Sequence, residues 1–202
     1  GIDCERCHGP GEIHVKEKRE GIIVDIENEI DYTIVNPSKL DEDLQFEICS
    51  RCHLQGITIL QEGKDWNSFL PGQKLSESMD VFIPKFKDDN KFIMASHVDR
   101  LKQSKCYTDG GVNCISCHNP HKSVQSTSKN IFNNKCQECH DVCVDNIKHS
   151  NCISCHMQPS SSLDIPHITI TDHKISIPKN NSRNLDSEIK EFIGLMCINN
   201  DN

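Results

Sequence analysis

The sequence predicts a mainly α-helical fold with much irregular coil, whose interior is filled by something other than an ordinary hydrophobic core. Hydrophobic side chains make up 35% of the 202 residues and aromatic ones 5%, whereas an average globular domain carries roughly 45–50% apolar residues. Thirteen residues are cysteine, and so many thiols indicate disulfides, bound metal or a covalent cofactor. One small β-hairpin is expected, near residues 22–35.

Ten of the thirteen cysteines belong to a single motif, Cys-x-x-Cys-His, which occurs five times. The two thiols of such a motif add to the vinyl groups of a haem and form thioethers, and the adjoining imidazole reaches the iron. We therefore expect five c-type haems, each with its iron, attached through Cys4, Cys7, Cys49, Cys52, Cys114, Cys117, Cys136, Cys139, Cys152 and Cys155, with His8, His53, His118, His140 and His156 as proximal iron ligands.

Three other uses of paired cysteines explain the pattern less well. Two Cys-x-x-Cys pairs can form a four-cysteine zinc site, but zinc makes no use of a histidine directly after every pair. A thioredoxin-like redox centre needs one pair on a βαβ unit rather than five pairs. Disulfides would not impose the same two-residue gap in every copy, so covalent haem is the favoured interpretation.

The last three motifs lie within residues 114–156. So little chain between attachment points forces their haems close together. Five haems would also fill most of the interior of a chain of this size, which accounts for the low apolar content. We therefore expect a fold organised around a closely packed haem array, through which electrons could pass.

The second axial ligand of each iron is expected to be another histidine. Six histidines lie outside the motifs, whereas the chain has only four methionines. Paired histidines give a lower reduction potential than a methionine ligand does. His14 and His121 follow their own motif histidines too closely to round the porphyrin, so each would ligate a neighbouring haem. The candidate distal ligands are His14, His97, His121, His149, His167 and His173, of which at least one is surplus to the five irons.

The first half of the chain is expected to carry few regular elements. A Gly-Pro-Gly sequence forces a turn in the haem loop of residues 1–14. Two β-branched runs around an acidic turn give the hairpin near 22–35. A helix is expected over 38–54, with a serine cap and acidic residues in its first turn. Residues 56–92 are mixed and loop-like, interrupted by prolines.

The second half is expected to hold the dense part of the haem domain. Residues 94–105 have a helical pattern that includes His97. Residues 106–160 carry three motifs joined by turns. Residues 160–184 are rich in Ser, Pro and Asn and are expected to be extended, and residues 185–198 have a short helical pattern.

Two domains are expected from this organisation. Residues 1–160 would form the five-haem cytochrome c domain, sparser over 1–105 and denser over 106–160. Residues 161–202 would form an extended segment that supplies distal histidines, followed by a short helix. Three cysteines lie outside the motifs: Cys106, Cys143 and Cys197. Cys106 and Cys143 could form a disulfide within the chain. The alternatives are a disulfide to another chain or a free thiol.

Several longer phrases carry a family resemblance: CERCHGPGEIH, LPGQKL, SHVDRLKQSKCYTDGGVNCISCHNPH, and CISCHMQP followed by IPHITITDHKI. They resemble the bacterial multihaem c-type cytochromes with doubled Cys-x-x-Cys-His motifs, a family often linked to tetratricopeptide repeats. The resemblance covers most of the chain and implies a multihaem cytochrome c with His14, His121 and His173 as distal ligands, and more weakly His167. It also implies that the chain is part of a longer polypeptide or a shortened relative.

Electron transfer is the favoured function, because an iron with two histidine ligands has no open position for a substrate. Two alternatives stay open. One is a multihaem oxidoreductase with one open-coordinate haem, acting on a small nitrogen or sulfur compound. The other is a subunit of an extracellular haem filament. The expected partners are redox proteins, including other multihaem cytochromes or copies of this chain.

Charge and cysteine content narrow the partners and the compartment. The net charge of −8 argues against nucleic acid and suits a basic redox partner. No apolar run approaches the roughly 18–20 residues of a membrane span. Covalent haem is attached outside the bacterial inner membrane, as the resemblance implies, and so many cysteines would be unusual in a reducing cytosol. A periplasmic or extracellular location is therefore expected.

Overall fold

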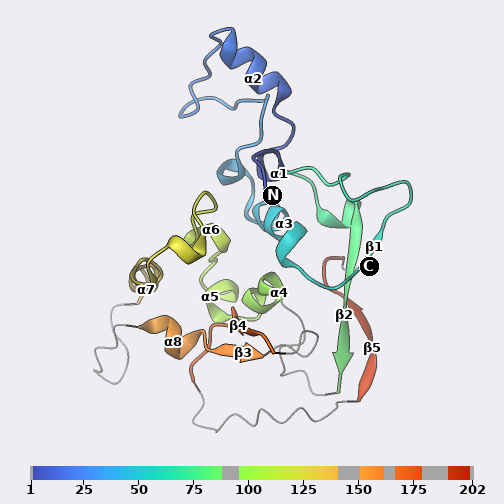
Figure 1. Ribbon diagram of the computed structural model, residues 1–202, viewed down its shortest axis with the longest axis vertical. Helices are drawn as coiled ribbons and strands as arrows, with labels where there is room; N and C mark the ends of the chain where they lie inside the picture. Colours follow the sequence, from blue (N-terminus) through green and yellow to red (C-terminus); the bar gives the residue numbers. More distant parts are fainter. Residues whose placement is uncertain (1, 88–95, 141–150, 162–166, 179–190, 201–202) are drawn as a thin grey trace. The chain divides into compact units, whose positions relative to one another are not determined.

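The computed structural model describes residues 2–87, 96–140, 151–161, 167–178 and 191–200 (Figure 1). The chain divides into two compact units. The first comprises Gly1–Cys52, Ile57–Phe82 and Cys197–Asn202, and the second comprises His53–Gly56 and Ile83–Met196.

The helices are short, and the cysteine motifs account for several of them. The α-helices are α1 (Glu5–His8), α2 (Glu12–Arg19), α3 (Glu42–His53), α4 (His97–Lys102), α5 (Lys105–Thr108), α6 (Cys114–Cys117), α7 (Lys129–Gln137) and α8 (Cys152–His156), with 3₁₀ turns at Pro37–Lys39, Leu75–Glu77 and Val124–Ser126. The acidic residues Glu42 and Asp43 open α3, where they interact favourably with the helix dipole. α3 and α4 lie inside the two helices predicted over 38–54 and 94–105.

The strands form two antiparallel sheets. They are β1 (Ile57–Leu60), β2 (Met79–Phe86), β3 (Pro159–Ser161), β4 (Thr169–Thr171) and β5 (Phe192–Cys197). In the larger sheet β2 lies between β1 and β5 (Figure 1), and the register of β1 with β2 sets Ile57 opposite Phe82 and Leu60 opposite Met79. In the smaller sheet Pro159 of β3 lies opposite Thr171 of β4.

This fold is mixed α/β, which corrects the prediction of a mainly α-helical protein organised around a haem array. Helices account for 37% of the described residues and strands for 15%. The prolines of residues 56–92 had indicated a loop, yet β2 contains Pro84. Because β1 pairs only with the first half of β2, the missing N–H of Pro84 breaks no hydrogen bond to β1.

The predicted hairpin near residues 22–35 is wrong, since these residues form turns. Asp25 accepts a hydrogen bond from the backbone N–H of Glu27 at 3.2 Å, and Asp31 accepts one from the N–H of Thr33 at 3.0 Å. Aspartate side chains that bond to the backbone two residues further on stabilise turns in place of a strand ladder. The hydrogen bonds of these two aspartates therefore favour turns over the strands that the β-branched runs predicted.

The short helix predicted over residues 185–198 is also wrong where the structure describes it, because Phe192–Cys197 is strand β5. Its ends are tied to β2: the N–H of Lys87 donates to the carbonyl of Glu191 at 3.2 Å, and the N–H of Ile198 donates to the carbonyl of Val81 at 3.0 Å. Long-range pairing with β2 overrides the local helical pattern.

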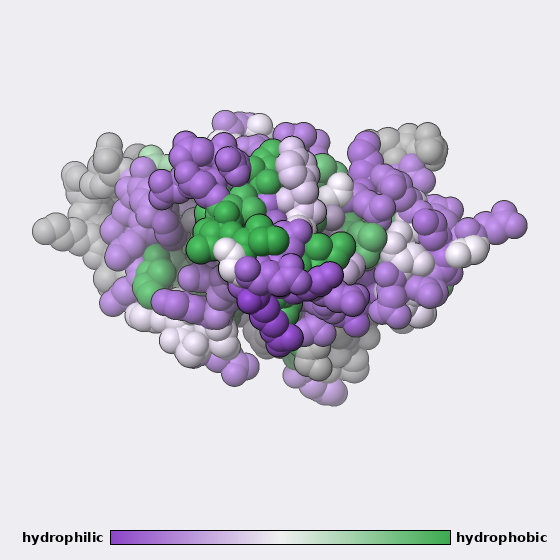
Figure 2. All heavy atoms as spheres, turned by 90° about the horizontal axis from the view of Figure 1, so that it is seen from above, coloured by the Kyte–Doolittle hydropathy of each residue, from purple (hydrophilic) through white to green (hydrophobic). Residues whose placement is uncertain are grey.

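The described residues contain a small hydrophobic core. In the first unit the buried apolar side chains are Phe46, Ile48, Phe69, Leu75, Met79 and Val81, and in the second they are Leu54, Val98 and Leu101. Many apolar residues are exposed instead, among them Ile23 and Tyr32, and Figure 2 shows hydrophobic residues at the surface between hydrophilic ones. No helix in the described parts of the chain is long and apolar enough to cross a membrane.

Candidate functional site

All five Cys-x-x-Cys-His motifs form a helical turn within or at the end of a helix: the first, second, third and fifth at α1, α3, α6 and α8, and the fourth at the C-terminal end of α7 and the turn that follows it. The backbone N–H of the motif histidine donates to the carbonyl of the first cysteine at 3.0 Å for His8, 2.9 Å for His118 and 3.0 Å for His140. Residues three and four apart lie on the same face of a helix. Each motif therefore presents two thiols and one imidazole on one side, as two thioether bonds and an iron ligand require.

The third and fifth motifs share a cap that starts this turn. The sequence Asn-Cys-Ile-Ser-Cys-His occurs at both positions. The side chain of Asn113 accepts a hydrogen bond from the N–H of Ser116 at 3.0 Å, and that of Asn151 accepts one from the N–H of Ser154 at 3.2 Å. Asparagine is among the best N-cap residues, so the local sequence itself favours the turn.

Four imidazoles from distant parts of the sequence gather in the second unit. The ring centroids are 5.7 Å apart for His53 and His97, 4.4 Å for His97 and His173, and 6.2 Å for His118 and His173. His118 and His173 are stacked, with an interplanar angle of 25°. We call these four residues the histidine cluster. It unites two predicted proximal ligands with two predicted distal ones.

The spacing in the histidine cluster suits iron held between two imidazoles. A metal–imidazole bond is about 2 Å long, so two rings that share one metal have centroids roughly 6 Å apart. The pairs His53–His97 and His118–His173 meet this requirement. Each pair contains one motif histidine and one from outside the motifs.

Burial favours the neutral form of three imidazoles in the histidine cluster. Burial, followed by the neighbouring imidazoles, lowers the pKa of His97 to about 4. Burial also lowers the pKa of His118 and of His173. Neutral imidazole is the form that binds metal. Nδ1 of His97 is buried and has no hydrogen-bond partner among the described residues, so no acceptor there orients this ring through Nδ1.

Backbone carbonyls orient three of the candidate imidazoles. Nδ1 of His8 lies 2.8 Å from the carbonyl oxygen of Val35. Nδ1 of His156 lies 3.0 Å from the carbonyl oxygen of Ser176, and Nδ1 of His173 lies 3.1 Å from that of Thr171. A carbonyl only accepts, so Nδ1 must donate and Nε2 keeps its lone pair. Metal-binding histidines are held in the same way in many proteins.

A bidentate ion pair joins the segments that carry His97 and His173. Nε and Nη2 of Arg100, on α4, donate to the two carboxylate oxygens of Asp172 at 2.8 and 2.6 Å. The Arg100 side chain is only 8% exposed and that of Asp172 18%. Burial opposes ionisation of Asp172, but hydrogen bonds from Arg100 and from the N–H of Lys174 outweigh it and lower the pKa of this carboxyl.

We expect Arg100→Met to destabilise the protein by about 2 kcal/mol, because it leaves a mostly buried carboxylate unpaired. Because folding lowers the pKa of Asp172 below its ordinary value of 3.8, the stability from this pair is complete above about pH 4 and is lost on further acidification. Urea denaturation at pH 7 and at pH 3 measures both effects. The matched control is Lys87→Met, in the exposed pair Lys87–Glu191, which should change stability by less than about 0.5 kcal/mol. Equal losses in the two variants would contradict this prediction.

The motif thiols influence one another within each unit. In the first unit burial raises the pKa of Cys7, and Cys49 and Cys52 raise it further. In the second unit burial raises the pKa of Cys136 to about 11, with further contributions from Cys152 and Cys117. Such surroundings favour an uncharged sulfur, and a thioether is uncharged. Cysteines of different motifs therefore lie near one another.

The remaining predicted histidines and cysteines lie outside the histidine cluster. His121, His140 and His167 are exposed, and His14 lies in the first unit beside Thr33 and Asp31. His149 and Cys143 lie outside the described residues. Cys106 and Cys197 form no disulfide among the described residues. Because Cys143 lies outside them, the predicted pairing of Cys106 with Cys143 stays a prediction.

The residues that support the histidines were missed from sequence. Arg100, Asp172, Thr33 and Asp31 have no spacing that links them to a motif, and only the Asp-His dipeptide at Asp172 gave a local signal. The structure describes no group of three or more His, Cys, Asp or Glu side chains that could hold a bare metal ion. A haem iron requires only two axial protein ligands, and the paired imidazoles and motif turns fit that group.

Comparisons with protein-family models, curated proteins and solved structures find no match to this chain.

Proposed function

We propose that the protein transfers electrons through five c-type haems covalently bound to its Cys-x-x-Cys-His motifs. The single observation that carries this proposal is the pairing of motif histidines with histidines from elsewhere, His53 with His97 and His118 with His173. Bound haem would supply a reversible one-electron iron couple. Zinc at the same cysteines would give these imidazole pairs no role.

The chain's own residues would bind and orient the cofactor. Two thiols would anchor each haem, and the motif histidine on the same turn would supply an iron ligand. Carbonyl acceptors hold His8, His156 and His173 with Nε2 available. At the pairs His53–His97 and His118–His173 a second imidazole would occupy the remaining iron position, which favours electron transfer over substrate chemistry.

Proximity of the attachment sites supports electron exchange between them. The thiols of the third, fourth and fifth motifs influence one another's pKa values: Cys117 responds to Cys139, and Cys136 responds to Cys152. In the first unit Cys7 responds to cysteines of the second motif. Haems attached at these cysteines would have near neighbours within each unit.

The net charge of −8 would steer encounters with a basic redox protein, including another multihaem cytochrome. A periplasmic or extracellular location belongs to the same proposal, because covalent haem and so many cysteines suit an oxidising compartment.

The test mixes the reduced, haem-loaded protein with an oxidised basic monohaem cytochrome c in a stopped-flow spectrometer. We expect all five haems to be reoxidised, at a rate that falls as salt is added because charge attraction is screened. Nitrite, hydroxylamine and CO should leave the spectrum unchanged. Reoxidation of only part of the haem, or a spectrum that shifts with these ligands, would overturn electron transfer in favour of an open, substrate-binding iron.

A further inference from the structure

A carboxylate lies behind the imidazole of His14 in the first unit. Nδ1 of His14 lies 3.1 Å from Oγ1 of Thr33 and 3.3 Å from Oδ2 of Asp31. The Thr33 hydroxyl is hydrogen-bonded in turn to Asp31. The Asp31 side chain is only 8% exposed and that of His14 28%. Unlike the carbonyls behind His8, His156 and His173, the group behind His14 carries a full negative charge.

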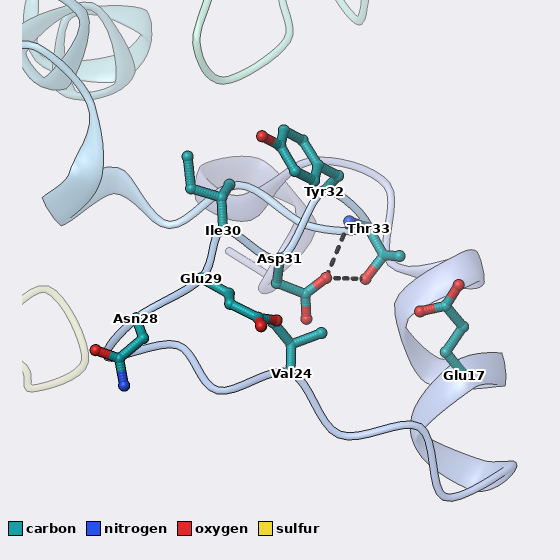
Figure 3. A pocket seen from close by; sticks show the side chains of 8 residues that line it. All are labelled: Glu17, Val24, Asn28, Glu29, Ile30, Asp31, Tyr32 and Thr33. Carbon is teal, nitrogen blue, oxygen red and sulfur yellow. Dashed lines mark hydrogen bonds between the residues drawn. The ribbon is translucent and has the colours of Figure 1, made fainter.

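The carboxylate sets the direction of these hydrogen bonds. An ionised aspartate only accepts, so the Thr33 hydroxyl donates to Asp31, as the Thr33 backbone N–H does at 3.0 Å (Figure 3). The hydroxyl oxygen then accepts from Nδ1–H of His14. This places the proton on Nδ1 and leaves the Nε2 lone pair for a metal.

We propose that Asp31 is a positioning residue for His14. Together with Thr33, Asp31 holds the His14 imidazole through Nδ1, and it makes His14 a more electron-rich iron ligand. The inference rests on the proposed haem binding. A carboxylate that polarises Nδ1–H, here through the Thr33 hydroxyl and from 3.3 Å away, raises the basicity of a ligating histidine, and a more basic ligand stabilises oxidised iron over reduced iron. The haem that His14 ligates therefore has a lower reduction potential than it would have without Asp31.

Lys18 opposes this effect. Its Nζ lies 3.1 Å from Oδ2 of Asp31, and it lies four residues after His14 on α2, so both side chains face the same carboxylate. The pocket of about 620 Å³ beside Asp31 is lined by the acidic side chains of Glu17 and Glu29 (Figure 3). Lys18 therefore offsets part of the negative charge, and its removal should act in the direction opposite to removal of Asp31.

The test measures the potential of each haem by spectroelectrochemistry in the haem-loaded protein, with haem content and low-temperature EPR spectra for every variant. We expect Asp31→Asn to shift the reduction equilibrium of one haem about tenfold toward the reduced form, equivalent to about 59 mV. Thr33→Val should shift the same haem in the same direction, and Lys18→Gln should shift it the other way. The matched control Asp25→Asn makes the same charge change in the neighbouring turn and should leave that haem unchanged. His14→Ala identifies the haem concerned by converting its iron to high spin.

Unchanged potentials in Asp31→Asn, or equal shifts in Asp31→Asn and Asp25→Asn, would overturn the inference. A low-spin spectrum that persists in His14→Ala would overturn it as well. A high-spin iron shared by Asp31→Asn and His14→Ala supports it, because the imidazole has lost its support. Five haems per chain in all variants would leave the proposed function standing whatever the potentials show, whereas absence of covalent haem from the unsubstituted protein would overturn both.

Discussion

A chain in which Cys114 and Cys117 are both replaced by alanine is expected to carry one covalent haem fewer than the unsubstituted protein. The α6 turn would keep His118, but an imidazole alone forms no covalent link to the porphyrin, so that haem would be lost on denaturation. Intact mass and haem absorbance of the denatured protein measure the loss directly.

The matched control is Cys106→Ala. Cys106 lies near the motif thiols, since it raises the pKa of Cys117, but it belongs to no motif. We expect the control to retain five haems. Loss of a haem from Cys106→Ala, or an unchanged haem count when Cys114 and Cys117 are replaced, would show that the motif does not attach the cofactor.

Replacement of His173 by alanine is expected to convert one low-spin iron to high spin. The ring centroids of His173 and His118 are 6.2 Å apart, so under the proposed haem binding the loss of His173 would remove the second ligand of the iron held by His118. EPR and optical spectra of the oxidised protein report the change. His97→Ala should convert a different iron, the one held by His53, and the double variant should convert two.

The adjacent substitution Lys174→Ala serves as the control and should leave every iron low-spin. If His173→Ala also leaves every iron low-spin, the histidine cluster does not ligate haem as proposed. If the double variant converts only one iron, both histidines belong to the same site.

Much of the candidate site could be predicted from sequence because its chemistry is local. The spacing of two cysteines and a histidine is one helical turn, and a cap such as Asn113 starts that turn. Which distal histidines meet which motif could not be predicted, because that depends on long-range contacts. The ion pair of Arg100 with Asp172 spans 72 residues and sets two of the histidines side by side.

The sheets could not be predicted from the sequence either, because their strands pair through long-range contacts. The N–H of Val81, on β2, donates to the side chain of Asn199 at 2.7 Å across 118 residues, and no local pattern announces such a pairing. Conversely, the β-branched runs near residues 22–35 had a strand-like pattern, but Asp25 and Asp31 capture the backbone N–H groups in turns. Short apolar runs in a chain with a small hydrophobic core are weak evidence for strand or helix.

The haem count and spin state of the fully oxidised protein test the central claim most directly. Five covalent haems per chain, all low-spin by EPR at low temperature, are the result that paired histidine ligands predict. A protein without covalent haem, with zinc or disulfides at the Cys-x-x-Cys-His motifs, would contradict the account. So would a high-spin fraction of about one iron in five that shifts when nitrite or hydroxylamine is added.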